Sequence, residues 1–281
     1  MDDQDYHTLS LVSKQFLSFT NLLRSSLTIK SDDDLTTQQV LNLIRRFPNL
    51  TSLHICGHRA DIDKLLHQIS TLTFKITSLK LSNLTTIPSN GLLDFYYNYR
   101  FLTDLPCSLT SLTCSYTDYI RTTHMFLIAH YFPALEVLDL NHCHDISSLG
   151  LYHVLHRCRS ITHLNLAGCS GLKLREMMRF EVPPLEVLNL SYSTVDDQSL
   201  NVISNSFRWI LQLSLESCDY VTHNGVNRVL QDCTQLTEIN LNGVKDDIIH
   251  FNVASMVLLR PSLKKIILIL PNGLCWEWSK E

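Results

Sequence analysis

The chain has 281 residues, of which 45% are hydrophobic and 18% charged, a composition that indicates a globular protein and argues against disorder. Its net charge of −4 and the absence of a dense Lys and Arg run argue against a nucleic-acid partner. Asp2, Asp3 and Asp5 stand where a secretion signal would be basic, and no apolar run reaches the ~18 residues that span a bilayer. We therefore expect no membrane association and a cytoplasmic or nuclear protein.

Residues 1–30 contain the run LSLVSKQFL at positions 9–17, followed by LTI at 27–29. These residues resemble the second half of an F-box, as found in plant F-box/leucine-rich-repeat proteins. The Leu-Pro motif and the further helix with which an F-box begins have no match here. We therefore interpret residues 1–30 as a helical remnant of an F-box.

This resemblance implies partners and contact residues. In that family the F-box binds the Skp adaptor of a cullin-type ubiquitin ligase, and the repeats hold the substrate. A Skp-type adaptor and a cullin are thus the implied partners. The adaptor-binding contact that the resemblance implies consists of Leu9, Leu11, Val12 and Phe16.

From residue 31 onward, one phrase recurs nine times, as SLHICG, SLKLSN, SLTCSY, VLDLNHC, HLNLAGC, VLNLSYS, QLSLESC, EINLNGV and KIILILP. The leading apolar residues follow one another at intervals of 26, 33, 26, 26, 24, 25, 26 and 27. A period near 26 is typical of leucine-rich repeats. These leading residues are Leu50, Ile76, Leu109, Leu135, Ile161, Leu185, Ile210, Leu236 and Leu263.

Each phrase predicts a strand, and the residues after it predict a helix. Alternation such as Leu138-Asp139-Leu140 points apolar side chains to one face and polar ones to the other. Later residues have one-face helical spacing, with Ser147 and Thr222 as expected N-caps. We predict an α/β solenoid over residues 31–281, a horseshoe of about nine repeats with a parallel sheet on the concave side and helices on the convex side.

Five cysteines fall on two fixed positions of the repeat. Cys143, Cys169 and Cys218 follow a strand leucine by three residues, and Cys158 and Cys233 end their helices. This pattern resembles the cysteine-containing subclass of leucine-rich repeats and implies that these thiols are buried packing groups. All nine cysteines are expected to be reduced, since their number is odd and none forms a CxxC pair.

The concave face of the predicted sheet is the candidate substrate-binding surface. Its residues follow from the strand alternation, and amide groups suit a polypeptide because they both donate and accept hydrogen bonds. The alternative is a solvated face, or a ladder of Asp139, Asn165 and Asn189 that merely satisfies itself. The candidate residues are His54, Lys80, Thr113, Asp139, Asn141, His163, Asn165, Asn189, Gln212, Ser214, Glu216, Glu238, Asn240 and Asn242.

The 33-residue interval contains the densest aromatic segment of the chain, residues 88–103. One interpretation is a longer helix packed on the convex side, because aromatic residues commonly anchor a core. The other is an extra loop that presents tyrosines to a partner. Both rest on five aromatic residues around Arg100, which are Phe95, Tyr96, Tyr97, Tyr99 and Phe101.

One cluster invites a metal hypothesis, namely His142, Cys143, His144, His153, His156 and Cys158. We expect no metal there, because the two cysteines have core positions and adjacent residues of an extended turn point apart. The sequence has no GxSxG, HExxH or phosphate-binding glycine motif. We therefore expect no cofactor and no enzymatic activity.

Terminal repeats expose an apolar edge unless something covers it. At the front, Leu35, Val40, Leu41 and Ile44 predict a capping helix. At the back, residues 264–270 predict a strand, and the short remainder with Trp276 and Trp278 predicts either tryptophan packing over that strand or a missing downstream segment.

Three functions remain open from the sequence. The first is a substrate-recognition subunit of an SCF-type (Skp-cullin-F-box) E3 ubiquitin ligase, which presents an unidentified substrate protein for ubiquitination. The second is a free-standing leucine-rich-repeat scaffold that does not bind the ligase adaptor. The third is a small-molecule receptor, for which the sequence reveals no pocket. Adaptor binding by the N-terminal segment discriminates between the first two.

Overall fold

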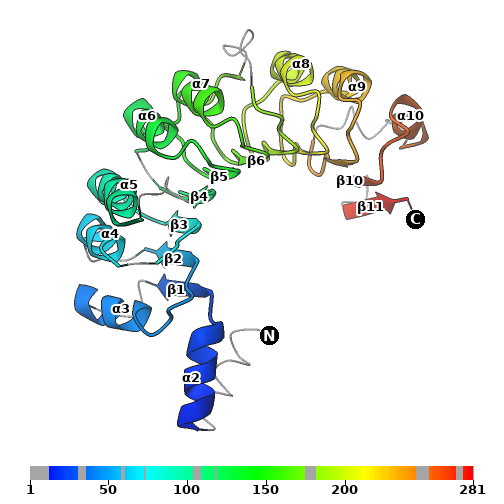
Figure 1. Cartoon of the computed structure of the whole chain (residues 1–281). Helices are drawn as coiled ribbons and strands as arrows, with labels where there is room; N and C mark the ends of the chain where they lie inside the picture. The colour runs from blue at the N-terminus through cyan, green and yellow to red at the C-terminus, as the bar shows by residue number, and fades with distance from the viewer. Residues whose placement is uncertain are drawn as a thin grey trace. The chain divides into compact units, whose positions relative to one another are not determined.

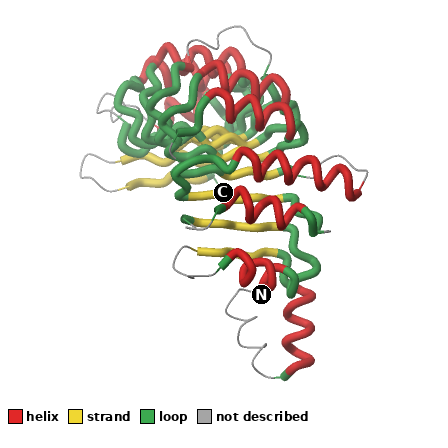
Figure 2. The backbone as a smooth tube through the Cα atoms, turned by 90° about the vertical axis from the view of Figure 1, so that its left-hand side faces the viewer, coloured by secondary structure: helices red, strands yellow, loops and turns green. Residues whose placement is uncertain are grey.

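The structure, a computed structural model, describes residues 13–30, 36–57, 61–72, 74–103, 109–117, 119–174, 182–244, 253–269 and 275–280. Strands and helices alternate along these residues, and Figure 2 shows them as separate layers. The strands are β1 (Ser26–Lys30), β2 (Ser52–Cys56), β3 (Ser78–Ser82), β4 (Ser111–Thr113), β5 (Val137–Asp139), β6 (His163–Asn165), β7 (Val187–Asn189), β8 (Gln212–Ser214), β9 (Glu238–Asn240), β10 (Lys265–Ile269) and β11 (Cys275–Ser279).

The helices connect these strands. They are α2 (Lys14–Leu23), α3 (Thr37–Ile44), α4 (Ile62–Ser70), α5 (Ser89–Thr103), α6 (Thr122–Tyr131), α7 (Ser148–Arg157), α8 (Asp197–Ser206), α9 (His223–Asp232) and α10 (Val253–Leu259). The predicted N-caps are confirmed. The Ser147 hydroxyl accepts the Gly150 N–H at 3.1 Å, and the Thr222 hydroxyl accepts the Asn224 N–H at 3.2 Å.

The chain forms two compact units. Unit 1 comprises residues 1–84 and 88–112, with β1 to β3 and α2 to α5, and unit 2 comprises residues 85–87 and 113–281, with β5 to β11 and α6 to α10. The boundary between them falls inside β4. Figure 1 shows helices α6 to α9 on one side of the unit 2 strands. The opposite face of each unit's strands is called its helix-free face below.

Within each unit, the strands pair in chain order. Parallel ladders align equal repeat positions, so that Leu53 lies opposite Leu79 in unit 1 and Leu138 opposite Leu164 in unit 2. The nine predicted strands are β2 to β10, and their nine leading apolar residues are all buried. The predicted α/β architecture, with a parallel sheet and alternating helices, is confirmed.

Two strands were not predicted. Ser26–Lys30 was expected to belong to a helical segment but forms β1, which pairs in parallel with β2 and buries Leu27 and Ile29. Leu27 precedes Leu53 by one repeat of 26 residues, but Arg24 stands where other repeats have an apolar residue. The helical prediction for residues 1–30 is therefore wrong at its C-terminal end, where the first repeat strand lies.

The predicted ends also need correction. Val40, Leu41 and Ile44 are buried in α3, which lies between β1 and β2 in the chain and is thus a repeat helix instead of a front cap. Leu35 lies outside the described residues. At the back, β11 runs antiparallel to β10, with Trp278 opposite Ile266. The tryptophan segment thus adds an edge strand to the sheet.

A left-handed residue follows the strand in nearly every repeat. These residues have φ between +53° and +71° and form what we call the turn column, which consists of Gly57, Asn83, Tyr116, His142, Gly168, Tyr192, Ser217 and Gly243. Their amides extend the ladder between repeats: the His142 N–H donates to the Ala167 carbonyl at 2.7 Å, and the Gly168 N–H donates to the Ser191 carbonyl at 2.7 Å. The described repeats of unit 2 from β4 to β9 are thus bonded to one another beyond the strands themselves.

The cysteine positions of the repeat are buried in unit 2, as predicted. The Cys143, Cys169 and Cys218 thiols donate to backbone carbonyls of the preceding repeat, at 2.9, 3.1 and 3.1 Å. Burial raises the pKa of Cys158 to about 12 and that of Cys169 to about 11. These thiols are therefore protonated packing groups at neutral pH.

Candidate protein-binding surfaces

A column of polar side chains runs along the helix-free face of unit 2. Strand pairing places its members side by side at the third position of five successive strands. Each side chain has intermediate exposure. This alignment confirms the predicted polar column, which consists of Asp139, Asn165, Asn189, Ser214 and Asn240.

Four members of the polar column also accept a hydrogen bond from the turn that follows their own strand. The side-chain oxygens of Asp139, Asn165, Asn189 and Asn240 each accept the backbone N–H two residues later, at 2.9 to 3.1 Å. This Asx-turn geometry fixes the orientation of each side chain. These oxygens bond within their own turns instead of across the strands, so each side chain satisfies part of its own hydrogen-bonding capacity, as the alternative interpretation predicted. The NH2 groups of Asn165 and Asn189 can therefore donate to a ligand, whereas that of Asn240 donates to Glu216.

Glu216, which follows β8, accepts hydrogen bonds from three neutral side chains. Its carboxylate accepts the Tyr192 hydroxyl at 2.7 Å and the side-chain amides of Asn240 and Asn242 at 3.2 Å each. The hydrogen bond to this carboxylate raises the pKa of Tyr192. The predicted residues Glu216, Asn240 and Asn242 therefore form one network. The Oδ1 atoms of Asn242 and of Asn141 are buried and have no hydrogen-bond partner in the part of the chain that the structure describes.

The first positions of the same strands form a second row on this face. His163 and Gln212 are exposed, and Glu238 has intermediate exposure. Gln212 Nε2 donates to Glu238 Oε1 at 3.2 Å, and Lys265 Nζ lies 3.0 Å from Glu277 Oε1. The predicted residues of unit 2 are thus brought together on one face, as the strand alternation requires.

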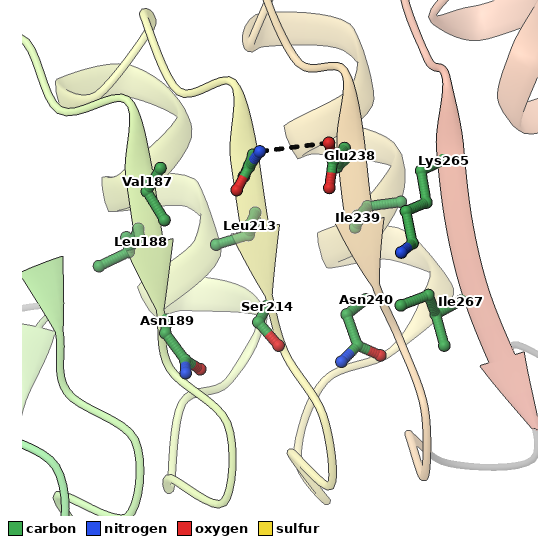
Figure 3. A pocket seen from close by; sticks show the side chains of 11 residues that line it. Val187, Leu188, Asn189, Leu213, Ser214, Glu238, Ile239, Asn240, Lys265 and Ile267 are labelled. Atoms are coloured by element: carbon green, nitrogen blue, oxygen red, sulfur yellow. Dashed lines mark hydrogen bonds between the residues drawn. The ribbon is translucent and has the colours of Figure 1, made fainter. Parts of the chain in front are cut away.

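A hollow of about 190 Å³ opens between the polar column and the first row, over strands β7 to β10. Figure 3 shows Asn189, Ser214 and Asn240 along one end of it and Glu238 at the other. Val187 and Ile267 lie on opposite sides. The sequence did not predict this hollow, because it depends on side-chain sizes in four repeats.

Unit 1 presents a different set of side chains on its helix-free face. Thr28, His54 and Lys80 are aligned on β1 to β3, and His54 Nε2 lies 2.8 Å from Ser82 Oγ. Burial, together with the positive charges of Lys80 and Lys30, lowers the pKa of His54. The predicted residues His54 and Lys80 therefore lie side by side on a face that favours neutral histidine.

Thr113, which was predicted to be available on the concave face, is buried. The alternation that placed it outward fails at β4, where Leu112, Thr113 and Cys114 are all buried. Thr113 is therefore not part of a contact surface.

Helix α2 carries an apolar stripe that faces solvent. Phe16, Phe19, Leu22 and Leu23 are 45%, 63%, 47% and 60% exposed, although apolar side chains of this size are usually buried. Phe16, Phe19 and Leu23 have i, i+3, i+7 spacing and so share one face of the helix. Among the predicted adaptor contacts, Phe16 lies on this stripe, whereas Leu9, Leu11 and Val12 lie outside the described residues. The sequence analysis missed Phe19, Leu22 and Leu23, although their spacing carried the signal.

Local contacts hold α2 at the start of unit 1, where Figure 1 shows it beyond β1. Ser13 caps its first turn by accepting the Phe16 N–H at 3.3 Å. At its other end, Asn49 Nδ2 donates to the Leu22 carbonyl at 2.7 Å, and the Arg24 guanidinium lies 5.2 Å from the centre of the Phe47 ring. The stripe is thus presented on a helix that is anchored at its C-terminal end.

The aromatic segment at residues 88–103 is the long helix α5. Phe95 is buried, and Tyr96 and Tyr97 contact each other edge to face with ring centres 5.3 Å apart. The interpretation as a longer repeat helix is confirmed, and the segment is not a loop. Tyr97 is 55% exposed on this helix, so the contact of a tyrosine with a partner stays a prediction. The side chains of Tyr99, Arg100 and Phe101 lie outside the described part of the structure.

The histidines of the suspected metal cluster point to different neighbours. His142 stacks on Tyr116 with ring centres 4.5 Å apart, and His153 packs edge to face on Phe126 at 4.4 Å. His156 stacks on Tyr152 at 5.5 Å, and Cys143 and Cys158 are buried. Among the described residues, no group of three or more His, Cys, Asp or Glu side chains is placed to hold a metal ion.

No protein-family model matches this chain. Among solved structures, a chain in the crystal structure of the Rad7 and Elc1 complex in yeast is similar, with a TM-score of 0.57 over 92% of this chain and 73% of that one. The two share 15% sequence identity, so the likeness concerns the fold. This chain has the leucine-rich-repeat fold. Among the residues that the structure describes, no helix is long and apolar enough to cross a membrane.

Proposed function

We propose that this leucine-rich-repeat chain is the substrate-recognition subunit of an SCF-type E3 ubiquitin ligase. It binds a Skp-type adaptor, and through it a cullin, with the apolar stripe of α2, and it binds a substrate protein with the helix-free face of its sheet. It acts by binding and contributes no catalytic group. We also propose a cytoplasmic or nuclear location, because ligases of this type act in these compartments.

The exposed stripe of α2 is the observation that carries this proposal. Four large apolar side chains on one short helix are costly to leave in water, since burying each is worth about 1.5–3 kcal/mol. An amphipathic helix with such a stripe commonly binds in an apolar groove of a partner. The stripe precedes the first repeat strand, which is where the F-box resemblance places an adaptor contact.

The helix-free face supports the second half of the proposal. The polar column and Glu216 offer both amide donors and carboxylate acceptors, which are suited to a polypeptide ligand. Side chains fixed by Asx turns also lose little conformational entropy on binding. A structure of similar fold has been crystallised as a complex of Rad7 and Elc1, which supports a role in protein assembly.

The experiment is capture of a purified Skp-type adaptor and cullin by the full chain. We expect Phe19→Ser combined with Leu23→Ser to weaken capture by at least about tenfold, the loss that truncating apolar anchors commonly causes. Lys14→Gln is the control, because Lys14 is exposed on the same helix and its position in the helical turn lies on the side away from the stripe. Circular dichroism checks that the variants fold.

Two results would contradict the proposal. One is adaptor capture that the stripe variant leaves unchanged, which would remove α2 from the contact. The other is no capture at all by the full chain, which would favour a free-standing leucine-rich-repeat scaffold instead.

A further inference from the structure

We infer that the hollow over β7 to β10 is an anchor pocket, which receives one aliphatic side chain of an extended protein segment whose neighbouring residue is basic. This inference rests on the proposed function, because it specifies the substrate that the helix-free face would bind. It names a substrate class by its chemistry, namely an aliphatic residue beside a lysine or arginine.

The pocket lies where the polar column has a shorter side chain. Asn189 and Asn240 each close a turn through their side-chain oxygen, but between them stands Ser214, whose side chain is shorter. The Ser214 hydroxyl lies 2.8 Å from Ser191 Oγ, in the turn of the preceding repeat. An asparagine at position 214 would extend over the hollow and could close its turn as its neighbours do. Position 214 therefore lacks the locally favourable asparagine of its neighbours at a place where a cavity lies.

The size and walls of the hollow fit an apolar side chain. Its volume of about 190 Å³ exceeds the roughly 150 Å³ of an apolar cavity that holds benzene in another protein. Val187 and Ile267 bound it from opposite strands, so an aliphatic group entering it would contact apolar atoms on both sides (Figure 3). A single branched aliphatic side chain fits this space.

The charge around the hollow selects the neighbouring residue. Lys265 is paired with Glu277 at 3.0 Å, which offsets its positive charge. Glu238 accepts a hydrogen bond from the neutral Gln212, and Glu216 accepts three from neutral groups. Over the residues described, neither carboxylate has a cationic partner, so a basic side chain of the ligand would complement them.

The rim can also hold a peptide backbone. The oxygen of the Asn189 side chain is occupied by the Ser191 N–H at 3.0 Å and the Ser191 hydroxyl at 2.7 Å, which orients its NH2 group. An oriented amide donor at the edge of a pocket can bind a main-chain carbonyl while the neighbouring side chain enters the hollow.

The experiment probes the full chain with an array of short random-sequence peptides. We expect captured peptides to be enriched in Leu, Ile or Val next to Lys or Arg. Ser214→Asn should weaken capture by about tenfold or more, the loss expected when an anchor is excluded. Because an asparagine fits this position in neighbouring repeats, we expect this variant to fold with an unchanged or higher melting temperature.

Two further variants separate the parts of the site. Glu238→Gln should remove the preference for a basic residue but keep the aliphatic one. Gln198→Asn is the control, since Gln198 is exposed on helix α8, on the side of the unit 2 strands away from the helix-free face. It should leave capture unchanged.

The inference would be overturned by captured peptides without this motif, by equal capture with Ser214→Asn, or by no captured peptides at all. The adaptor contact is measured separately on α2, so its failure and the failure of this site are distinguishable.

Discussion

The two units present different chemistry on equivalent faces. In unit 1, the helix-free positions of β1 to β3 are serine, threonine, cysteine, His54, Lys30 and Lys80, without a carboxylate. The carboxylates of unit 1 bond to its helices instead. Asp61 caps α4, Asp63 accepts the Gly91 N–H, and Asp94 pairs with His67. In unit 2, amides and carboxylates dominate the same positions. One backbone pattern thus supports two surfaces that suit different ligands.

The units also differ in what links successive repeats. In unit 2, buried thiols donate to carbonyls of the preceding repeat, and Asx turns close most strands. In unit 1, Cys56 is only half-buried, and Leu84 occupies the position that Cys143 has in unit 2. The difference shows that a regular set of small polar contacts keeps the unit 2 side chains in fixed positions, and the hollow lies in this regular part.

The largest expected effect tests whether the units are separately stable. Phe47 and Phe132 begin the same FPxL phrase, one in each unit, and both are buried. We expect each Phe→Ala variant to lower the free energy of unfolding by about 3–5 kcal/mol, because it leaves a cavity. Hydrogen exchange resolved along the chain should show lost protection mainly in the unit that carries the substitution. Equal loss of protection in both units would mean that they unfold as one.

Much of this fold was predictable because each strand phrase carries a leading apolar residue and an alternating pair. β1 escaped prediction because Arg24 replaces the leading residue, and β11 because it returns antiparallel and has no such phrase. A repeat search depends on the residue types that recur. It therefore fails at the ends of the array, where the last strands have different neighbours.

The candidate surfaces were predictable only in part. Strand alternation correctly placed Asn165 and Asn240 on one face, because successive side chains must point to opposite sides. It could not predict that Tyr192 would donate to Glu216, 24 residues later, or that Ser214 would leave a hollow. These features depend on side-chain lengths across strands, which no single repeat encodes.

A smaller effect is expected at Gly168, in the turn column. Its φ is +70°, and a Cβ there would lie only 2.5 Å from Nδ1 of His142, whose ring is stacked on Tyr116. We expect Gly168→Ala to lower the free energy of unfolding by about 2 kcal/mol, because a left-handed conformation alone costs an L-residue roughly 1–2 kcal/mol. Urea denaturation followed by circular dichroism measures this loss.

The control is Gly243, which lies in the corresponding turn of another repeat. It has a φ of +71°, but a Cβ added there would meet the short Ser217 hydroxyl. Gly243→Ala should therefore cost less than Gly168→Ala. Combining Gly168→Ala with His142→Ala should recover part of the loss, because the two sites are in contact. Full additivity in the double variant would contradict the proposed contact with the His142 ring.

Over a single pH unit, the smallest effect concerns the buried thiols of unit 2 at alkaline pH. Burial raises the pKa of both Cys158 and Cys233 from 9.0 to about 12 in the folded chain. Above pH 9 the unfolded thiols ionise while the folded ones stay protonated, so the stability that is present below pH 9 is lost as the pH rises toward about 12. The expected loss is about 1.4 kcal/mol per thiol for each pH unit within this window.

This prediction is checked by urea denaturation of the wild type and of Cys158→Ala combined with Cys233→Ala, at several pH values across the window. The double variant should be less stable near neutral pH, because it loses packed sulfur atoms, but its stability should fall less steeply as the pH rises. Ionisation of tyrosines and lysines affects both chains alike and cancels in the difference of slopes. Identical slopes would mean that Cys158 and Cys233 ionise as readily in the folded chain as in the unfolded one, which would contradict the burial that raises the pKa of these two helix-ending thiols.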